Sequence, residues 1–283
     1  MARPAAGAAL GTRHPTRSPL FRAACLLLGA IVVLGIAAEW VAPYSPTALD
    51  AQGLFQAPGV RHWMGTDRFG RDLLSRILFG VRVSVGIAGI AITVALAAGA
   101  ALGLLAGVGR GLDQLCGRVM DVFFAFPPIL LAIAIAAVLG AGVESAIAAI
   151  AVVYAPLFFR VVRGSVLAES AQAYVEAAEA LGLGRGAILR RHILPNAVSP
   201  VIVQTAVCLS YGILIESALS YLGVGVQPPT PSWGTILNEG KEFLALAPWV
   251  SLFPGGAIML TVLALNVVGD GLRDSLDPRA VTR

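Results

Sequence analysis

Residues that could carry out chemistry are few in this 283-residue chain, and their spacing forms no familiar site. The three histidines lie far apart, and the three cysteines show neither a CxxC pair nor a disulfide framework. A glycine loop of the GxxxxGK[ST] type, which would cradle a nucleotide phosphate, does not occur. The sequence therefore predicts no catalytic residue, no metal ligand and no cofactor in this chain. Any energy source must come from a partner protein or an ion gradient.

One polar stretch, between two long apolar segments, could instead bind another protein. Its first part, Tyr174–Gly182, carries small and apolar residues on a short helix, which another backbone can approach closely. Glu176 favours the positive end of that helix dipole, and Gly182 can take the positive φ that ends a helix. An arginine-bearing helix over about 185–193 follows, and Pro195 ends it. The residues expected to make the contact are Glu176, Ala177, Ala178, Leu181, Gly182, Arg190, Leu194 and Pro195.

The same stretch has a second interpretation. An amphipathic loop could lie on lipid headgroups, with its arginines paired to anionic lipid. The residue types alone support the two interpretations equally.

Composition places the chain among polytopic membrane proteins. Apolar residues make up 57% of it and charged residues only 13%, about half the charged share of a soluble domain. The net charge of +4 gives no reason to expect a nucleic-acid partner. The apolar residues form blocks long enough to cross a hydrocarbon core as helices. The expected fold is all-α, with six spans at 23–43, 83–108, 119–140, 143–159, 198–222 and 248–268.

The arginines predict the orientation of these spans in the membrane. With both termini inside, 14 of the 20 basic residues fall on the inner side, as the positive-inside rule requires. The first span could instead be the apolar part of a signal peptide. The tryptophans agree with the orientation, because they fall at or beyond outer span ends, where indole rings anchor at the interface. They are Trp40, Trp63, Trp233 and Trp249.

This topology divides the chain into five parts. We expect a basic cytoplasmic tail at 1–22, a first transmembrane helix at 23–43 and an extracytoplasmic segment at 44–82. A five-helix core follows at 83–270 and a cytoplasmic tail at 271–283. The polar stretch forms a cytoplasmic loop at 164–196 within the core.

Prolines and glycines predict local breaks and close contacts. Pro127-Pro128 should break the third span, and the prolines of 227–234 should make a stiff extended strap. A row of small residues should let the second span pack closely on another helix, as a fixed or a sliding contact. The row consists of Ala91, Ala95, Gly99, Gly103 and Gly107.

Polar residues outside the hydrocarbon predict two further features. A short interfacial helix should begin at about Phe69, with Thr66 or Asp67 as its cap. Asp121, near the inner end of the third span, should pair with Arg118.

Ionisable and polar residues inside the spans are candidates for lining a transport pathway, because charge is costly in lipid. Glu216 is the strongest, since Ser220 lies one turn away on the same helix face. Gln204 and Asn266 are further candidates. Alternatively, Glu216 makes a structural hydrogen bond to a neighbouring helix or another subunit.

Motifs along most of the chain resemble one family. Tyr174–Gly182 with His192–Asn196 resembles a loop of ATP-binding-cassette importer permeases. A cytoplasmic ATPase binds to this loop in that family. Over about 23–279 the chain resembles the C-type subunit of the dipeptide, oligopeptide and nickel permease family. The other motifs are His62–Asp67, Gly70–Asp72, Asp121 with Phe126-Pro127, Arg160 with Arg163-Gly164, Leu219–Gly223, Gln227–Gly234 and Gly269–Arg279.

This resemblance implies a type I importer permease that is not itself an enzyme. It implies half of a pore for di- or oligopeptides, completed by a sister permease subunit. Two cytoplasmic ATPases would bind ATP and magnesium, and an extracytoplasmic solute-binding protein would deliver the ligand. Nickel, a metal chelate or glutathione are alternative substrates. A secondary transporter without an ATPase partner, or a membrane-anchored scaffold, are alternatives of another class.

Overall fold

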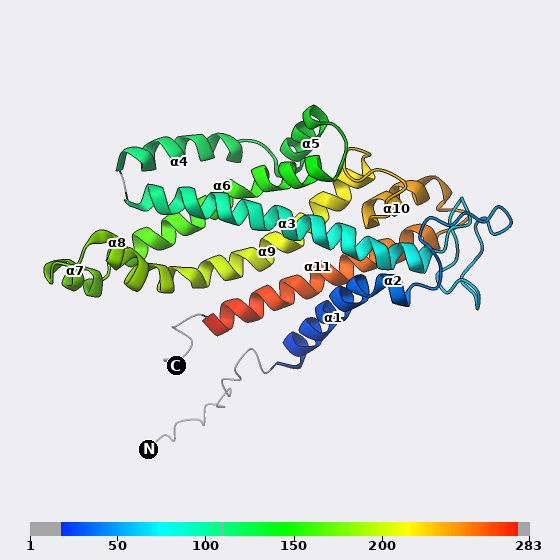
Figure 1. Cartoon of the computed structure of the whole chain (residues 1–283), viewed down its shortest axis with the longest axis horizontal. Helices are drawn as coiled ribbons and strands as arrows, with labels where there is room; N and C mark the ends of the chain where they lie inside the picture. The colour runs from blue at the N-terminus through cyan, green and yellow to red at the C-terminus, as the bar shows by residue number, and fades with distance from the viewer. Residues whose placement is uncertain (1–17, 109, 277–283) are drawn as a thin grey trace, which may run out of the picture.

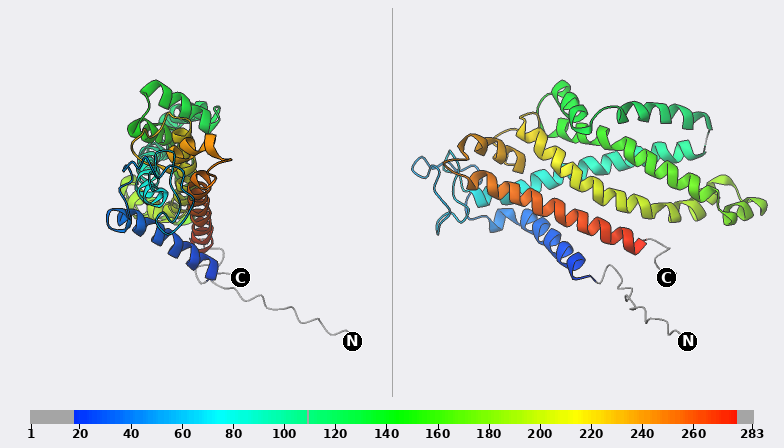
Figure 2. Two further views of the ribbon diagram at one scale, coloured as in Figure 1. Left: turned by 90° about the vertical axis from the view of Figure 1, so that its right-hand side faces the viewer. Right: turned by 180° about the vertical axis from the view of Figure 1, so that it is seen from behind.

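The computed structural model describes residues 18–108 and 110–276, and the regular secondary structure of these ranges is helical. The long helices run side by side, with α7 at one end of the molecule and α10 near the other (Figure 1, Figure 2). The elements are α1 (Pro19–Ile36), α2 (Ala38–Val41), α3 (Leu73–Val108), α4 (Arg110–Phe124), α5 (Pro128–Leu139), α6 (Val143–Ser170), α7 (Ala173–Ala180), α8 (Arg185–Ile188), the π-helical turn η2 (Leu189–Ile193), α9 (Leu194–Tyr221), α10 (Trp233–Gly240), the 3₁₀ turn η3 (Lys241–Phe243) and α11 (Trp249–Leu276).

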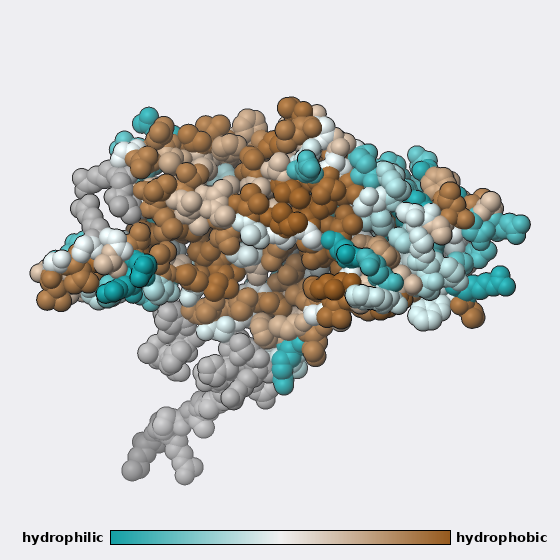
Figure 3. Space-filling view, viewed as in Figure 1, coloured by the Kyte–Doolittle hydropathy of each residue, from teal (hydrophilic) through white to brown (hydrophobic). Residues whose placement is uncertain are grey.

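Five helices in the described ranges are long and apolar enough to cross a membrane: α1, α3, α6, α9 and α11. The pair α4 and α5 makes a sixth candidate, a broken span bent by 93°. An apolar band covers the middle of the molecular face in Figure 3, and hydrophilic residues gather at its two ends. The expected all-α, six-span architecture is therefore confirmed if the broken pair counts as one span.

The break in the third span lies where the sequence predicts it. Pro127 is the residue before α5, and Pro128 is its first helical residue. Proline lacks the N–H that would continue the preceding helix, yet its fixed φ suits a helix start. The chain therefore turns between Phe124 and Pro128 and begins a new helix.

Two glycines of α3 lie directly against the backbone of α6. A Cβ on Gly99 would lie 2.4 Å from the carbonyl oxygen of Ala155, and one on Gly103 would lie 2.9 Å from that of Phe159. Because any side chain there would push the two helices apart, the small-residue row holds α6 directly against α3.

Helices α6 and α11 extend past the predicted span ends. The structure continues α6 to Ser170 and α11 to Leu276, beyond the expected ends at 159 and 268. Hydropathy marks only the part of a helix that lies in hydrocarbon, whereas helical hydrogen bonding continues into polar sequence. The same reason places the start of α4 at Arg110 rather than 119.

At the end away from α7, a buried ion network holds the segment between α2 and α3. Arg71 contacts Asp67 over 2.6 Å and Glu239 of α10 over 2.5 Å. Arg76 of α3 also pairs with Asp67, and it lies 2.6 Å from Glu239. Arg76 is only 1% exposed, so the network is a closed cluster that fastens α10 to α3.

The predicted interfacial helix from Phe69 is wrong. The chain is irregular up to Asp72, and α3 begins at Leu73 and runs unbroken to Val108. The predicted caps are wrong for the same reason, since the arginines engage Asp67 and the hydroxyl of Thr66 donates to the carbonyl of Gly53. Asp72 caps α3 instead, accepting a 2.8 Å hydrogen bond from the backbone N–H of Ser75.

Trp233 is buried, which corrects its prediction as an interfacial anchor. Its indole N–H donates to the carbonyl of Ile77, and its backbone N–H donates to Ser84, both on α3. Ser232 and Thr235 cap each other's backbone N–H groups, so α10 begins inside the segment that was expected to be an extended strap. Trp40 and Trp63 are exposed, as expected for anchors.

Candidate docking site between α6 and α9

The loop from α6 to α9 folds into a helical hairpin at one end of the molecule (Figure 1). Val175 and Ala178 of α7 are buried in a cluster with Val162 and Val166 of α6. The two α7 residues are three positions apart and share one helix face. This face fixes α7 to the end of a membrane-crossing helix.

The opposite face of α7 is exposed and carries predicted contact residues. Glu176, Ala177 and Leu181 lie on it, and Leu181 is 81% exposed. Ala178, also predicted to make the contact, instead packs against α6. The exposed face of α7 therefore ends in an apolar side chain at the tip of the hairpin.

Gly182 ends α7 in the predicted conformation. Its φ is +80°, in the left-handed region. The backbone N–H of Leu183 donates to the carbonyl of Ala178 over 3.2 Å, and that of Gly182 donates to Glu179 over 2.9 Å. These two bonds make a Schellman motif, which glycine forms without steric cost. The tip of the hairpin is therefore a defined turn.

The hydroxyl of Tyr174 joins three parts of the hairpin. It donates to Glu169 near the end of α6 and accepts a 3.2 Å bond from the side-chain amide of Asn196 at the start of α9. The same amide donates to the carbonyl of His192 over 2.8 Å. The hydrogen bond to Glu169 raises the pKa of the Tyr174 phenol above 10.

The other predicted contact residues lie on the second arm of the hairpin. Arg190 in η2 and Pro195 in the first turn of α9 are exposed, and Leu194 between them is half-buried. Ile193 is buried with the residues that hold α7. The structure thus brings the predicted loop residues into one hairpin.

Glu216, the strongest pathway candidate, is 0% exposed within the described chain. Ser220 donates to its carboxyl group over 2.9 Å, and Ser217 lies 3.4 Å away. Ser84 of α3 and Ser232 before α10 also lie beside this carboxyl group. The sequence pattern identified Ser220, but Ser84 and Ser232 become neighbours of Glu216 only in the fold.

The remaining pathway candidates do not join this cluster. Gln204 lies twelve residues before Glu216 on α9, a helical rise of about 18 Å. It borders a cavity of about 600 Å³ that Glu169 and Asn196 also line. Asn266 on α11 is exposed and accepts a 3.0 Å hydrogen bond from Ser210. The assignment of all four residues to a pathway stays a prediction.

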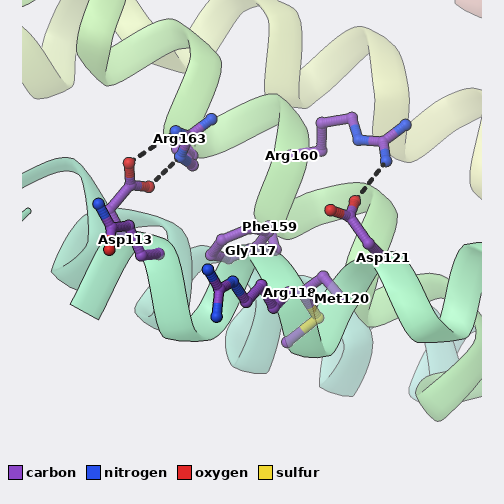
Figure 4. Close-up of a pocket in the computed structure, with 9 residues that line it drawn as sticks. Asp113, Gly117, Arg118, Met120, Asp121, Phe159, Arg160 and Arg163 are labelled. Atoms are coloured by element: carbon purple, nitrogen blue, oxygen red, sulfur yellow. Dashed lines mark hydrogen bonds and ion pairs between the residues drawn. The ribbon is translucent and has the colours of Figure 1, made fainter. Parts of the chain in front are cut away.

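A second cavity, of about 320 Å³, lies between α4 and α6 (Figure 4). Both carboxylate oxygens of Asp113 accept hydrogen bonds from the Arg163 guanidinium, and Asp121 lies 3.4 Å from Arg160. The predicted pair of Asp121 with Arg118 is wrong, because the Arg118 side chain points away from that carboxylate. The sequence analysis missed this cavity, although both arginines belong to a motif that it singled out.

Known proteins resemble the chain over most of its length. Residues 95–282 match the family described as binding-protein-dependent transport system inner membrane component. The dipeptide transport system permease protein DppC of Alkalihalophilus pseudofirmus is 43% identical over 255 residues, covering 90% of this chain and 84% of that protein. The glutathione transport system permease protein GsiD of Pectobacterium atrosepticum is 42% identical over 259 residues, covering 91% of this chain and 86% of that protein.

The fold also matches a solved structure. An inward-facing form of the MetNI methionine ABC transporter contains a chain that superposes with a TM-score of 0.60, covering 72% of this chain and 98% of that one. The sequence identity is 18%, so the likeness concerns the fold alone. It confirms the expected permease architecture.

Proposed function

Since the chain belongs to the family of inner membrane components of binding-protein-dependent transport systems, we propose that it forms one half of the pathway of an ATP-driven peptide importer. A sister permease completes the pore in this proposal, and two ATPases on the cytoplasmic side bind ATP and magnesium. An extracytoplasmic binding protein delivers a di- or oligopeptide. The chain itself performs no covalent chemistry.

The observation that carries this proposal is that one face of α7 is buried and the opposite face is exposed. Its buried face is packed on α6, and the hydroxyl of Tyr174 ties it to α9 as well. Its exposed face ends in Leu181 and is free to meet a partner. A push on α7 by an ATPase would therefore be transmitted to two membrane helices at once. The residues proposed for the contact are Glu176, Ala177, Leu181, Gly182, Arg190, Leu194 and Pro195, with Ala178 supporting them from behind.

The proposal fixes the orientation in the membrane. The end that carries α7 faces the cytoplasm with both termini, and the ion network of Arg76 and Glu239 lies outside. A reporter enzyme that is active only outside the cytoplasm should work when fused after Trp233 and fail when fused after Arg185. Activity after Arg185 contradicts the orientation.

Peptide is the proposed substrate, and glutathione is the second candidate because a relative of similar identity bears that name. The test is uptake into proteoliposomes that contain both permeases and the ATPases. Labelled dipeptide and labelled glutathione are supplied in parallel, each with the loaded binding protein. Uptake of dipeptide should require internal ATP, and the purified chain alone should hydrolyse none. Uptake driven by an ion gradient without the ATPases contradicts the proposal.

A further inference from the structure

The cavity of about 600 Å³ is bordered by three of the membrane-crossing helices, α6, α9 and α11. The end of α6 and the start of α9 lie on the side of the molecule that carries α7 (Figure 1). Small-molecule sites commonly have volumes of about 300–1,000 Å³, so this cavity has room for a small ligand. Its lining on α9 consists of Asn196, Ser199, Pro200, Val203, Gln204 and Val207.

Two opposite charges line this cavity from separate helices. Glu169 belongs to α6 and Arg273 to α11, and they are the only charged side chains among the described lining residues. Arg273 is exposed and makes neither an ion pair nor a hydrogen bond through its side chain within residues 18–108 and 110–276. Glu169 is half-buried, and Tyr174 donates to its Oε2, which leaves Oε1 open to a donor. The lining thus offers one cation and one anion to the same ligand.

Helix α9 adds uncharged polar groups to this lining. The half-buried hydroxyl of Ser199 has no hydrogen-bond partner in the part of the chain that the structure describes. The amide of Gln204 has a single weak contact, 3.4 Å from the sulfur of Cys208. Both groups can therefore hydrogen-bond a ligand without giving up a strong partner inside the protein.

The same face of α9 stays polar deeper in the bundle. Tyr211 follows Gln204 by two helical turns, about 10.5 Å along the axis, and is 53% exposed. It also lies ten residues before the end of α9 at Tyr221, about 15 Å from the interface where tyrosines commonly anchor. Polar side chains at such depth face a bundle interior or a water-filled cavity rather than lipid. The cavity therefore continues a polar stripe of α9.

We propose that this cavity binds the zwitterion of a dipeptide on its way to the cytoplasm, with the carboxylate at Arg273 and the ammonium group at Glu169. Ser199 and Gln204 hydrogen-bond the peptide group between the two ends. One cation and one anion match a ligand without net charge, whereas glutathione carries a second carboxylate that finds no cation among the described lining residues. The inference rests on the proposed peptide transport and names the part of the substrate that the chain recognises.

The test measures the binding of dipeptide to the purified permease–ATPase assembly without the binding protein. Equilibrium dialysis compares labelled alanyl-alanine with its C-terminal amide and its N-acetyl derivative. The wild type should bind the unmodified dipeptide about tenfold more tightly than either derivative, because each derivative lacks one charged hydrogen-bonding group. Arg273→Gln should bind the dipeptide and the amide equally, and Glu169→Gln should bind the dipeptide and the N-acetyl derivative equally. Arg118→Gln, at an exposed arginine of α4, is the matched control and should keep the wild-type preference.

Two results of the dialysis would overturn the inference. The first is the same binding of all three ligands by the wild type and both cavity variants. The second is an Arg273→Gln assembly that still prefers the dipeptide to its amide tenfold, because Arg273 would then not contact the carboxylate. A photoreactive residue at Val203 provides an independent check. It should label the dipeptide, and labelling of the sister permease instead would show that protein fills the cavity.

Uptake by wild-type proteoliposomes separates this inference from the proposed function. Absence of ATP-dependent dipeptide uptake contradicts the proposed function itself. Normal uptake together with either overturning result of the dialysis contradicts the binding site alone.

Discussion

Asn196 donates a hydrogen bond to the hydroxyl of Tyr174 over 3.2 Å, and this contact joins the start of α9 to α7. The same hydroxyl donates to Glu169 near the end of α6. One phenol oxygen therefore connects α7 to both membrane helices that flank the loop. If α7 receives the motion of an ATPase, this connection should determine how much of that motion reaches the bundle.

Replacing Tyr174 by phenylalanine should weaken coupling while leaving the fold intact. The substitution removes one hydroxyl from a partly exposed site, worth about 1 kcal/mol, or about fivefold in a coupled equilibrium. The measurement is peptide transported per ATP hydrolysed. Tyr44→Phe is the matched control, because the Tyr44 hydroxyl also donates a hydrogen bond, to the backbone carbonyl of Arg61 at the other end of the molecule. Equal ratios for the two variants contradict a coupling role for Tyr174.

The phenol in this contact should keep its proton up to about pH 10. The bond to Glu169 raises the pKa of Tyr174, so the phenol keeps its proton there. Its stabilising contribution is fully present below the unfolded pKa near 10 and is lost only as the pH rises through the higher folded pKa.

Gly182→Val should disrupt the tip of the hairpin. Its φ of +80° costs a side-chain-bearing residue about 1–2 kcal/mol, and more when the residue is β-branched. We expect α7 to fray and ATPase recovery to fall, whereas the membrane helices remain folded. Gly184→Val is the control, since a Cβ at Gly184 meets no other atom within 4 Å. Equal losses in both variants would mean that bulk, rather than the turn conformation, causes the effect.

Glu239→Gln should destabilise the end of the molecule that carries α10. The change removes one of the two carboxylates that balance the buried guanidinium groups of Arg71 and Arg76. Breaking such a pair from one side costs about 3–5 kcal/mol. Thermal unfolding of the purified assembly and protease sensitivity of residues 44–72 would measure the loss. Glu242→Gln, an exposed neighbour, should change neither quantity.

Glu216→Leu should destabilise the protein more than Glu216→Gln. An amide can still accept the bond from Ser220, whereas leucine leaves the buried serines without that acceptor, at a cost of about 1–3 kcal/mol. The measurement is thermal unfolding in parallel with peptide uptake. If Glu216→Gln keeps full thermal stability and loses peptide uptake, the carboxylate serves the pathway. If the two variants lose the same thermal stability, the hydrogen bonds accepted by Glu216 do not stabilise the fold.

Local sequence determines the parts of the fold that could be predicted. Pro127-Pro128 breaks a helix, and Gly182 ends one, through the conformational limits of these residues themselves. The row of Gly99 and Gly103 likewise predicts a close helix contact, although it does not say which helix makes it. The hairpin between α6 and α9 could be predicted from the sequence for this reason.

The contacts that the sequence did not reveal join distant segments. Trp233 pairs with an α3 carbonyl 156 residues away, and Arg76 meets Glu239 from another part of the chain. Hydropathy treats an indole beyond a span as an interfacial anchor and an arginine as a solvent-facing charge. Only the folded arrangement supplies the partners that let both be buried.

The exposed face of α7 tests the central claim most directly. Leu181→Asp and Glu176→Lys should reduce the ATPase recovered with an affinity-tagged permease pair by about tenfold or more, because a central interface side chain contributes about 1–4 kcal/mol. Leu246→Asp, at an exposed leucine before α11, is the control and should leave recovery unchanged. Binding of ligand by the soluble binding protein should be unaffected. Loss of ATPase and of uptake in the two α7 variants alone is the predicted result. Wild-type recovery and uptake in both would contradict the account of this hairpin as the docking site.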